Sequence, residues 1–179
     1  MEKYLYLILF FSFVFSASYS QCPTVEAIMV NACGSEGPDE FILVHSGSVG
    51  FNTSDLQFDF DHNNNNFGQQ NNDIHIDNGN NPSDPTPCSF VPGDASIISG
   101  CSNVISVGLN TFIPPNSILI VQTGNSASYV YDYSSLCGSN ECVYVIKNSC
   151  DRTSGAFTNG GSGTRTTIMS LSDGSGCSE

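Results

Sequence analysis

The stretch that decides the fold is Ala27–Gly47, AIMVNACGSEGPDEFILVHSG. Two apolar runs, Ala27–Val30 and Phe41–Val44, enclose the acidic insert Asn31–Glu40, which contains a cysteine, two glycines and a proline. β-Branched, aromatic and aliphatic residues favour strands, and a cluster of Gly, Pro and Asp between two such runs marks a turn rather than a helix. The stretch therefore predicts a two-stranded hairpin around which the later strands assemble.

The rest of the chain repeats this pattern of short strand-forming runs separated by turns. The strongest run is Ile118–Gln122, ILIVQ, whose unbroken apolar character is typical of a central strand buried on both faces. Asp55–Asp61 alternates apolar and polar side chains, which predicts one buried and one solvated face. The two strands of the hairpin are expected over Val25–Asn31 and Glu40–Ser46, and further strands at Cys142–Lys147 and Thr164–Leu171. With no amphipathic helix in this pattern, an all-β sandwich follows.

Two regions between the strands are expected to be long surface loops. His62–Asn81 is rich in asparagine, which tolerates left-handed backbone and bonds its own main chain, with one short strand around Ile74 and Ile76. Pro82–Pro92 carries four prolines among Ser, Asp and Thr residues, and no core is expected there. The predicted sandwich thus has long Asn- and Pro-rich loop insertions.

The first twenty residues have the pattern of a signal peptide. Lys3 supplies a charged start, Tyr4–Val14 an apolar centre, and a small-x-small site follows, so we expect cleavage before Gln21 and export. The apolar run is shorter than the roughly twenty residues that span a bilayer. Residues 21–179 are long enough for a single domain with its own core, and no transmembrane segment is expected in that mature chain.

The cysteines indicate an oxidising compartment, because an even count in an exported chain is typical of disulfides. We expect a pair between Cys137 and Cys142, which flank a turn-like tetrapeptide, and one between Cys88 and Cys101, which flank a loop containing Pro and Gly. The sequence alone leaves the full connectivity open. The eight cysteines are Cys22, Cys33, Cys88, Cys101, Cys137, Cys142, Cys150 and Cys177.

The charge of the chain restricts its partners. Seventeen acidic residues against four basic ones give a formal net charge of −13. Such a field repels phosphate backbones, so nucleic acid is excluded as a partner. A protein or a glycan is expected instead.

Two groups of carboxylates are candidate calcium ligands. Glu36, Asp39 and Glu40 crowd the hairpin insert, where the competing interpretation is a solvated turn with Asp39 bonding nearby backbone. The second group is spaced like the start of a calcium loop but lacks the glycine and the bidentate glutamate of an EF-hand. Its members are Asp59, Asp61, Asp73 and Asp77. Calcium is the one cofactor that the sequence suggests; otherwise none is expected.

No catalytic constellation is found. GxSxG, HExxH and a Cys/His pair with a free thiol are absent from the sequence, so we expect no enzyme activity. Tyr129, Tyr131 and Tyr133 alternate, and this stripe fits either stacking on sugars or a strand that covers the core. Both interpretations stay open at this point.

The order of these signals resembles the lamin tail domain, an immunoglobulin-like β-sandwich found in many exported bacterial proteins. The resemblance covers Val25 to Leu171. It is carried by Ile28–Asn31, Gly34-x-Glu36 before Asp39–Val44, Asp55-Leu56, the Ile113–Ile118 turn into ILIVQ, and Gly155–Gly160 before the last strand. The family implies an immunoglobulin-like fold and supplies no catalytic residues.

Three segments are more narrowly similar to the N-terminal domain of large surface proteins of gliding Bacteroidetes. They are ACGSEGPDEFILVHSG, GCSNVI and GAFTNGGSGTRTTIMSLS. Such proteins end in a type IX secretion sorting domain or a gliding-motility domain, and this chain departs from them by stopping at Glu179. The resemblance implies an exported, non-catalytic binding or scaffolding module at the cell surface, related to adhesion. The alternatives are a calcium-dependent carbohydrate-binding domain and an accessory domain of a secreted hydrolase.

Overall fold

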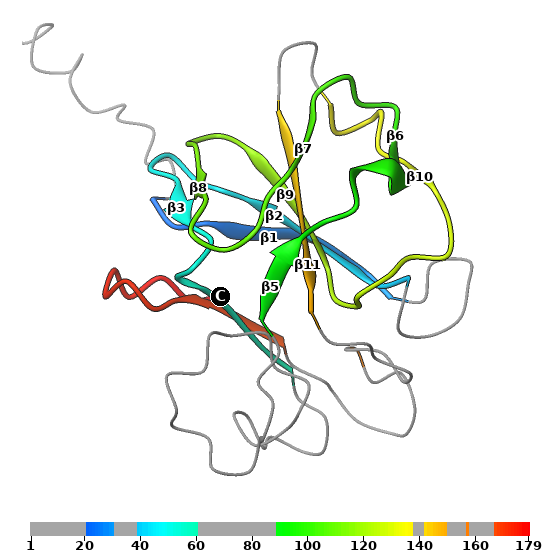
Figure 1. Cartoon of the computed structure of the whole chain (residues 1–179). Helices are drawn as coiled ribbons and strands as arrows, with labels where there is room; N and C mark the ends of the chain where they lie inside the picture. The colour runs from blue at the N-terminus through cyan, green and yellow to red at the C-terminus, as the bar shows by residue number, and fades with distance from the viewer. Residues whose placement is uncertain (1–20, 31–38, 61–88, 138–141, 150–156, 158–166) are drawn as a thin grey trace, which may run out of the picture.

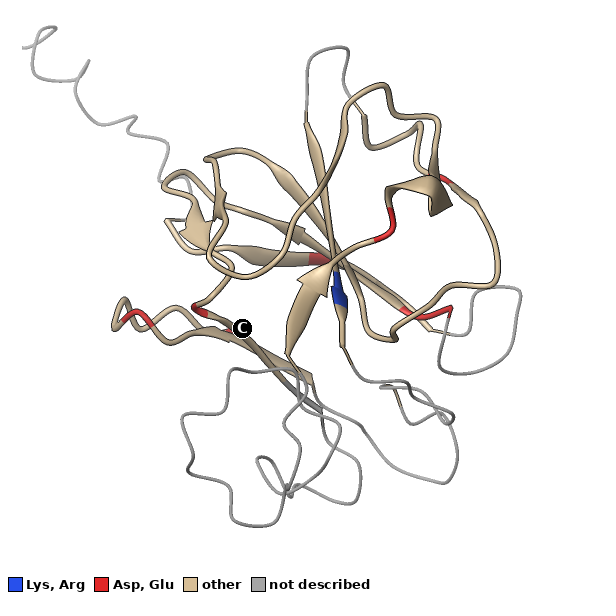
Figure 2. Cartoon of the chain, viewed as in Figure 1, with Lys and Arg blue, Asp and Glu red and all other residues tan. Residues whose placement is uncertain are grey.

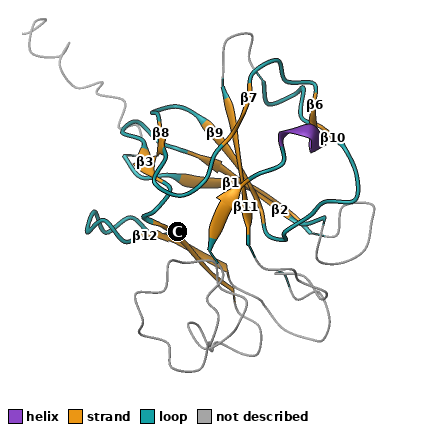
Figure 3. Ribbon diagram, viewed as in Figure 1, coloured by secondary structure: helices purple, strands orange, loops and turns teal. Residues whose placement is uncertain are grey.

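The computed structural model describes residues 21–30, 39–60, 89–137, 142–149, 157 and 167–179, without the side chains of residues 59 and 60 (Figure 1). Short strands make up nearly all of the regular structure in this part of the chain (Figure 3). The strands are β1 Thr24–Met29, β2 Phe41–His45, β3 Phe51–Asn52, β4 Leu56–Phe60, β5 Phe90–Pro92, β6 Ile98–Ser99, β7 Val104–Ser106, β8 Phe112–Ile113, β9 Ile118–Gln122, β10 Tyr131–Asp132, β11 Val143–Asn148 and β12 Thr167–Leu171. One 3₁₀ turn, η1 at Ala95–Ile97, precedes β6.

The body of the protein is a six-stranded sheet in the order β1-β2-β9-β11-β5, with β7 also paired to β11. β2 is antiparallel to β1 and β9, whereas β9 and β11 run parallel. The predicted central strand is confirmed, because β9 lies between two partners and four of its five side chains are buried. The predicted hairpin is confirmed as the β1–β2 pair, in which Ile28 faces Ile42 and Met29 faces Phe41.

Both faces of this sheet are covered, and each cover makes its own core. On one face, Leu56, Phe58 and Met169 come from the β4–β12 ladder and pack against the sheet. On the other face, Ile98 of β6 and Tyr133, which follows β10, pack against Phe41 and other sheet residues. Because successive side chains of a strand point to opposite faces of the sheet, each strand contributes residues to both cores. The expectation of an all-β, disulfide-stapled sandwich is confirmed.

The expectation that Pro82–Pro92 contributes nothing to the core is wrong for its last residues. Phe90 is buried and meets the ring of Phe58 edge-on at a centroid distance of 6.4 Å. Phe90–Pro92 forms β5, which pairs with the end of β11. A proline is tolerated there because β5 is an edge strand. The predicted strand around Ile74 and Ile76 lies outside the described residues.

The disulfides of the described chain differ from the expected pairs. Cys22 is bonded to Cys177, and Cys101 is bonded to Cys137, with Cα–Cα distances of 5.4 and 5.5 Å. The second bond replaces both favoured pairings, Cys137–Cys142 and Cys88–Cys101. The sequence favoured neighbours across short turns, whereas the fold brings together cysteines 36 residues apart. Cys142 is a free thiol.

The Cys22–Cys177 bond fastens the two ends of the described chain to each other. It closes a loop of 155 residues. The Glu179 side chain also accepts a hydrogen bond of 2.6 Å from the Val25 backbone N–H, and Ser178 bridges to Ser170 of β12. The bond therefore ties β1, at one edge of the main sheet, to the ladder that covers one face.

The Cys22→Ser/Cys177→Ser double variant is predicted to lose about 2–5 kcal/mol of unfolding free energy, because a long loop is no longer closed in the unfolded chain. Urea denaturation followed by circular dichroism measures the loss. Cys142→Ser is the matched control and should unfold at the wild-type midpoint. Equal midpoints for the double variant and the control would contradict the role given to this bond.

Peptide mapping of the unreduced protein is predicted to recover Cys22 linked to Cys177 and Cys101 linked to Cys137. Cys142 should react with iodoacetamide in denaturant without prior reduction, because its thiol is free. A linked Cys137–Cys142 peptide would contradict this connectivity.

Candidate functional site

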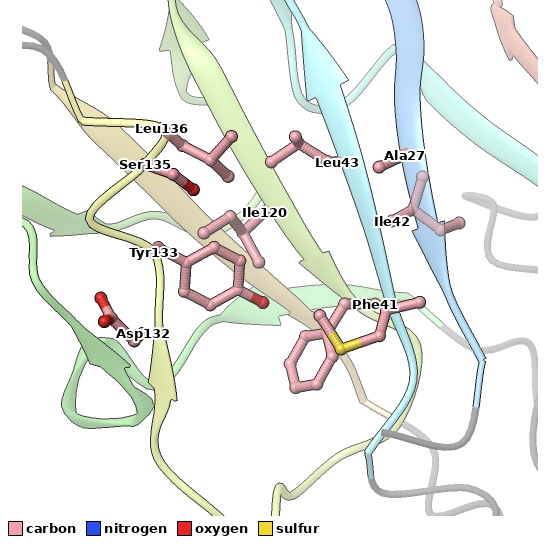
Figure 4. A pocket seen from close by; sticks show the side chains of 10 residues that line it. Ala27, Phe41, Ile42, Leu43, Ile120, Asp132, Tyr133, Ser135 and Leu136 are labelled. Carbon is pink, nitrogen blue, oxygen red and sulfur yellow. The ribbon is translucent and has the colours of Figure 1, made fainter. Parts of the chain in front are cut away.

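The described chain has an apolar pocket between the main sheet and residues 128–137, which we call the cover segment (Figure 4). Its volume is about 220 Å³. The sheet forms its floor and the cover segment its wall. The lining residues are Ala27, Met29, Phe41, Ile42, Leu43, Ile120, Asp132, Tyr133, Ser135 and Leu136.

The pocket opens toward β1, an edge strand of the main sheet. Phe41 and Ile120 on its inner side are 2% and 1% exposed, Met29 and Leu43 are partly buried, and Ala27 on β1 is exposed. Exposure therefore rises across the sheet from β9 to β1. A ligand would enter beside Ala27 and reach Phe41 at the inner end.

The cover segment is held over the sheet at three places. At its start, the Asp39 carboxylate accepts hydrogen bonds from the Ser128 backbone N–H at 2.8 Å and the Tyr131 hydroxyl at 2.7 Å. In its middle, β10 pairs with β6. At its end, Cys137 is bonded to Cys101. These anchors fix the wall of the pocket without filling the space next to β1.

A glycine allows the middle anchor to form. Gly100 follows β6 with a φ of 82°, a left-handed conformation that other residues rarely adopt. A Cβ at this position would lie 2.8 Å from the Ser134 backbone nitrogen. The close approach of the cover segment to β6 therefore needs a residue without a side chain.

Tyr133 places a hydroxyl group in the wall of the pocket. Its ring lies beside Ile120, and the hydroxyl points toward the side where Phe41 lies (Figure 4). The hydroxyl oxygen is buried and has no hydrogen-bond partner among the described residues. Burial raises the pKa of Tyr133 to about 12, because the phenolate is poorly solvated there. The group is therefore a protonated donor at neutral pH.

The side chain of Asp132 points away from the pocket, to the outer side of the cover segment (Figure 4). It is exposed, and its Oδ1 accepts a 2.9 Å hydrogen bond from the Ser134 backbone N–H. The backbone and side-chain hydrogen bonds from Ser134 lower the pKa of Asp132. The outer side of the cover segment therefore carries a negative charge at neutral pH. Figure 2 shows that acidic residues outnumber Lys147, the single basic residue among those described.

The interpretation of Asp39 and Glu40 as residues of a solvated turn is wrong. Both are fully buried. Asp39 bonds the cover segment, and Glu40 accepts from the Thr123 hydroxyl at 3.5 Å and the Phe157 backbone N–H at 3.2 Å. The partners of Glu40 are 83 and 117 residues away in sequence, and those of Asp39 are 89 and 92 residues away. Only the folded chain brings them together.

The tyrosine stripe divides into three environments. Tyr133 is buried, Tyr131 is half-buried with its ring 4.9 Å from that of Phe41, and Tyr129 is 52% exposed. Of the two interpretations left open, a strand that covers the core fits Tyr131 and Tyr133. The signal that the sequence offered for the pocket was this stripe, read together with the Phe41–Val44 strand.

The predicted calcium ligands are not brought together in the described part of the chain. Asp61, Asp73 and Asp77, like Glu36, lie outside the described residues, and of Asp59 only the backbone in β4 is described. Among the residues that are described, no group of three His, Cys, Asp or Glu residues is placed to hold a metal ion. The calcium site stays a prediction. The described residues also include no helix long and apolar enough to cross a membrane.

Comparison with known proteins adds no family. No family model, no curated protein and no solved structure matches the chain. The resemblance to the lamin tail domain therefore stays a prediction.

Two tyrosine variants are predicted to behave in opposite ways. Tyr131→Phe should lose about 1.5–3 kcal/mol of unfolding free energy, because the buried Asp39 carboxylate loses a donor. Tyr133→Phe removes a hydroxyl that has no partner and should be as stable as the wild type or slightly more stable. Urea denaturation of the two variants at pH 7 makes the comparison. Equal losses would contradict the assignment of Asp39 as the anchor.

The Tyr133 variant also has an expected pH dependence. An unfolded tyrosine ionises near pH 10, whereas folded Tyr133 ionises near pH 12, so its ionisation opposes folding as the pH rises above 10. Tyr133→Phe should therefore lose less stability than the wild type between pH 9.5 and pH 11. A parallel decline of the two proteins would show that Tyr133 is not buried.

Proposed function

We propose that this chain is an exported, non-catalytic binding module whose ligand site is the pocket beneath the cover segment. The observation that carries the proposal is the opening of the pocket beside β1, with apolar walls and the Tyr133 hydroxyl at a defined position. Binding sites are typically concave and mostly apolar, with a few polar groups that orient the ligand. An apolar cavity of about 150 Å³ holds benzene, so this pocket has room for a single ring or a branched alkyl group.

The disulfides support the exported part of the proposal, since such bonds persist in oxidising compartments. The signal-peptide pattern at Met1–Ser20 agrees with them. The resemblance to lamin tail domains and to surface proteins of gliding Bacteroidetes supports a place at the cell surface, in adhesion or scaffolding. A disulfide-stapled body with a small apolar pocket suits such a role.

A small neutral probe tests the pocket directly. The fluorine NMR signal of 4-fluorobenzyl alcohol is predicted to broaden with the wild-type protein, because its ring fits the apolar space. Ala27→Trp should abolish the broadening, since the new ring occupies the opening. The matched control, Ile105→Trp, changes an exposed residue of β7 that does not line the pocket and should bind like the wild type.

Ala27 is exposed, so the Ala27→Trp variant is expected to fold, and its circular dichroism spectrum verifies this. No broadening with the wild type, or equal broadening in Ala27→Trp and Ile105→Trp, would overturn the proposal.

A further inference from the structure

We propose that the ligand is an extended, positively charged peptide segment of another protein, which pairs with the outer edge of β1 and places one large apolar side chain in the pocket. This inference rests on the proposed function, because it names the occupant of the same pocket. It adds a second contact surface, the backbone of β1, and a charge requirement. Three observations support it in turn.

The first observation is the state of the sheet edge. In the described part of the chain, no strand pairs with the outer edge of β1. Near its start β1 is blocked from pairing with another strand, because the Val25 N–H is hydrogen-bonded to Glu179 and a bulge lies between Val25 and Ala27. The remaining part, Ala27–Met29, is regular and continues the register with β2. Backbone groups along such an edge are a template for an added strand.

The second observation is the place of this edge relative to the pocket. Ala27 and Met29 are two residues apart, so both point to the face of the sheet on which the pocket lies. A strand added beside them would lie about 4.8 Å away, and every second side chain would project on the same face. The pocket is open on that side. A phenylalanine or leucine of the added strand therefore reaches the apolar floor formed by Leu43 and Phe41.

The apolar residues of the other face agree with this arrangement. Ile28, which points away from the pocket, is 45% exposed, and the next residue beyond the strand, Val30, is 42% exposed. Large apolar side chains along an edge strand favour contact with another chain. An added strand would cover part of Ile28.

The third observation is charge. Glu26 is exposed on β1 itself, and Asp132 is exposed on the outer side of the cover segment. Together with the net charge of −13, these carboxylates attract lysine and arginine and repel acidic segments. The same field repels a second copy of this chain. A basic peptide from a different protein is therefore the favoured occupant.

The test uses a fluorescein-labelled nine-residue peptide of sequence KTKTFTKTK and fluorescence anisotropy at low salt with the mature wild-type protein. We expect saturable binding. Replacing the central phenylalanine with serine should weaken binding about tenfold or more, because burial of that ring is lost. Replacing the four lysines with glutamates should weaken it at least as much, because the attraction to Glu26 and to the acidic chain becomes repulsion.

Backbone methylation distinguishes strand pairing from simple pocket filling. Two further peptides carry N-methyl groups on alternate amides, one set on each edge of the extended peptide. Methylation of the edge that faces β1 should abolish binding, whereas methylation of the opposite edge should leave it within about threefold, because only the first edge donates hydrogen bonds. Equal effects of the two sets would overturn strand pairing.

Protein variants complete the test. Ala27→Trp should lose peptide binding, Ile105→Trp should retain it, and Glu26→Gln, which removes the charge on β1, should weaken it about threefold. Peptide binding that is unchanged in Ala27→Trp would overturn the inference. So would a protein that dimerises through β1 in analytical ultracentrifugation, with loss of the dimer in Ala27→Trp.

The failure of this inference can be told apart from failure of the proposed function. If 4-fluorobenzyl alcohol binds and is excluded by Ala27→Trp while the peptide does not bind, the pocket is a ligand site but its occupant is not a strand. If neither probe binds, both proposals are overturned.

Discussion

The hydrogen bonds of the buried Asp39 carboxylate are the interaction on which the pocket depends. Asp39 stands immediately before Glu40 and β2, and its Oδ1 holds both the backbone of Ser128 and the hydroxyl of Tyr131. A buried carboxylate lowers the stability of the folded state unless it is hydrogen-bonded. The folded state is therefore more stable when the cover segment is in place and donates to Asp39. Phe41 follows in β2 and packs its ring against Tyr131, which couples this polar anchor to the core.

The two faces of the main sheet are covered to different extents. Because β9 and β11 are buried on both faces, each face needs a cover, and the β4–β12 ladder supplies a broad one on the first face. The second face is covered by short strands and a loop. This cover reaches Ile120 and Phe41 fully but stops short of β1, and the uncovered strip is the pocket. A pocket thus arises where one layer of the sandwich is narrower than the sheet it covers.

Much of the fold is predictable from the sequence, and the reason is local. The Asp55–Asp61 alternation placed Leu56 and Phe58 correctly in a core, and ILIVQ identified the central strand with its final boundaries, because periodicity and apolar runs depend on neighbouring residues. Phe90 was missed since the prolines around it are typical of loops, and only its pairing with β11 and contact with Phe58 make it a core residue.

By itself the sequence determined the all-β class, the hairpin, the acidic charge and the use of disulfides, which follow from composition and short-range pattern. The tertiary structure alone decided which cysteines pair, that Asp39 and Glu40 are buried, and where the pocket opens. The physical reason is distance along the chain. Asp39 contacts partners 89 and 92 residues away in sequence, and Cys22 is bonded to a cysteine 155 residues away. The residues adjacent to Asp39 or Cys22 in the sequence therefore do not predict these contacts.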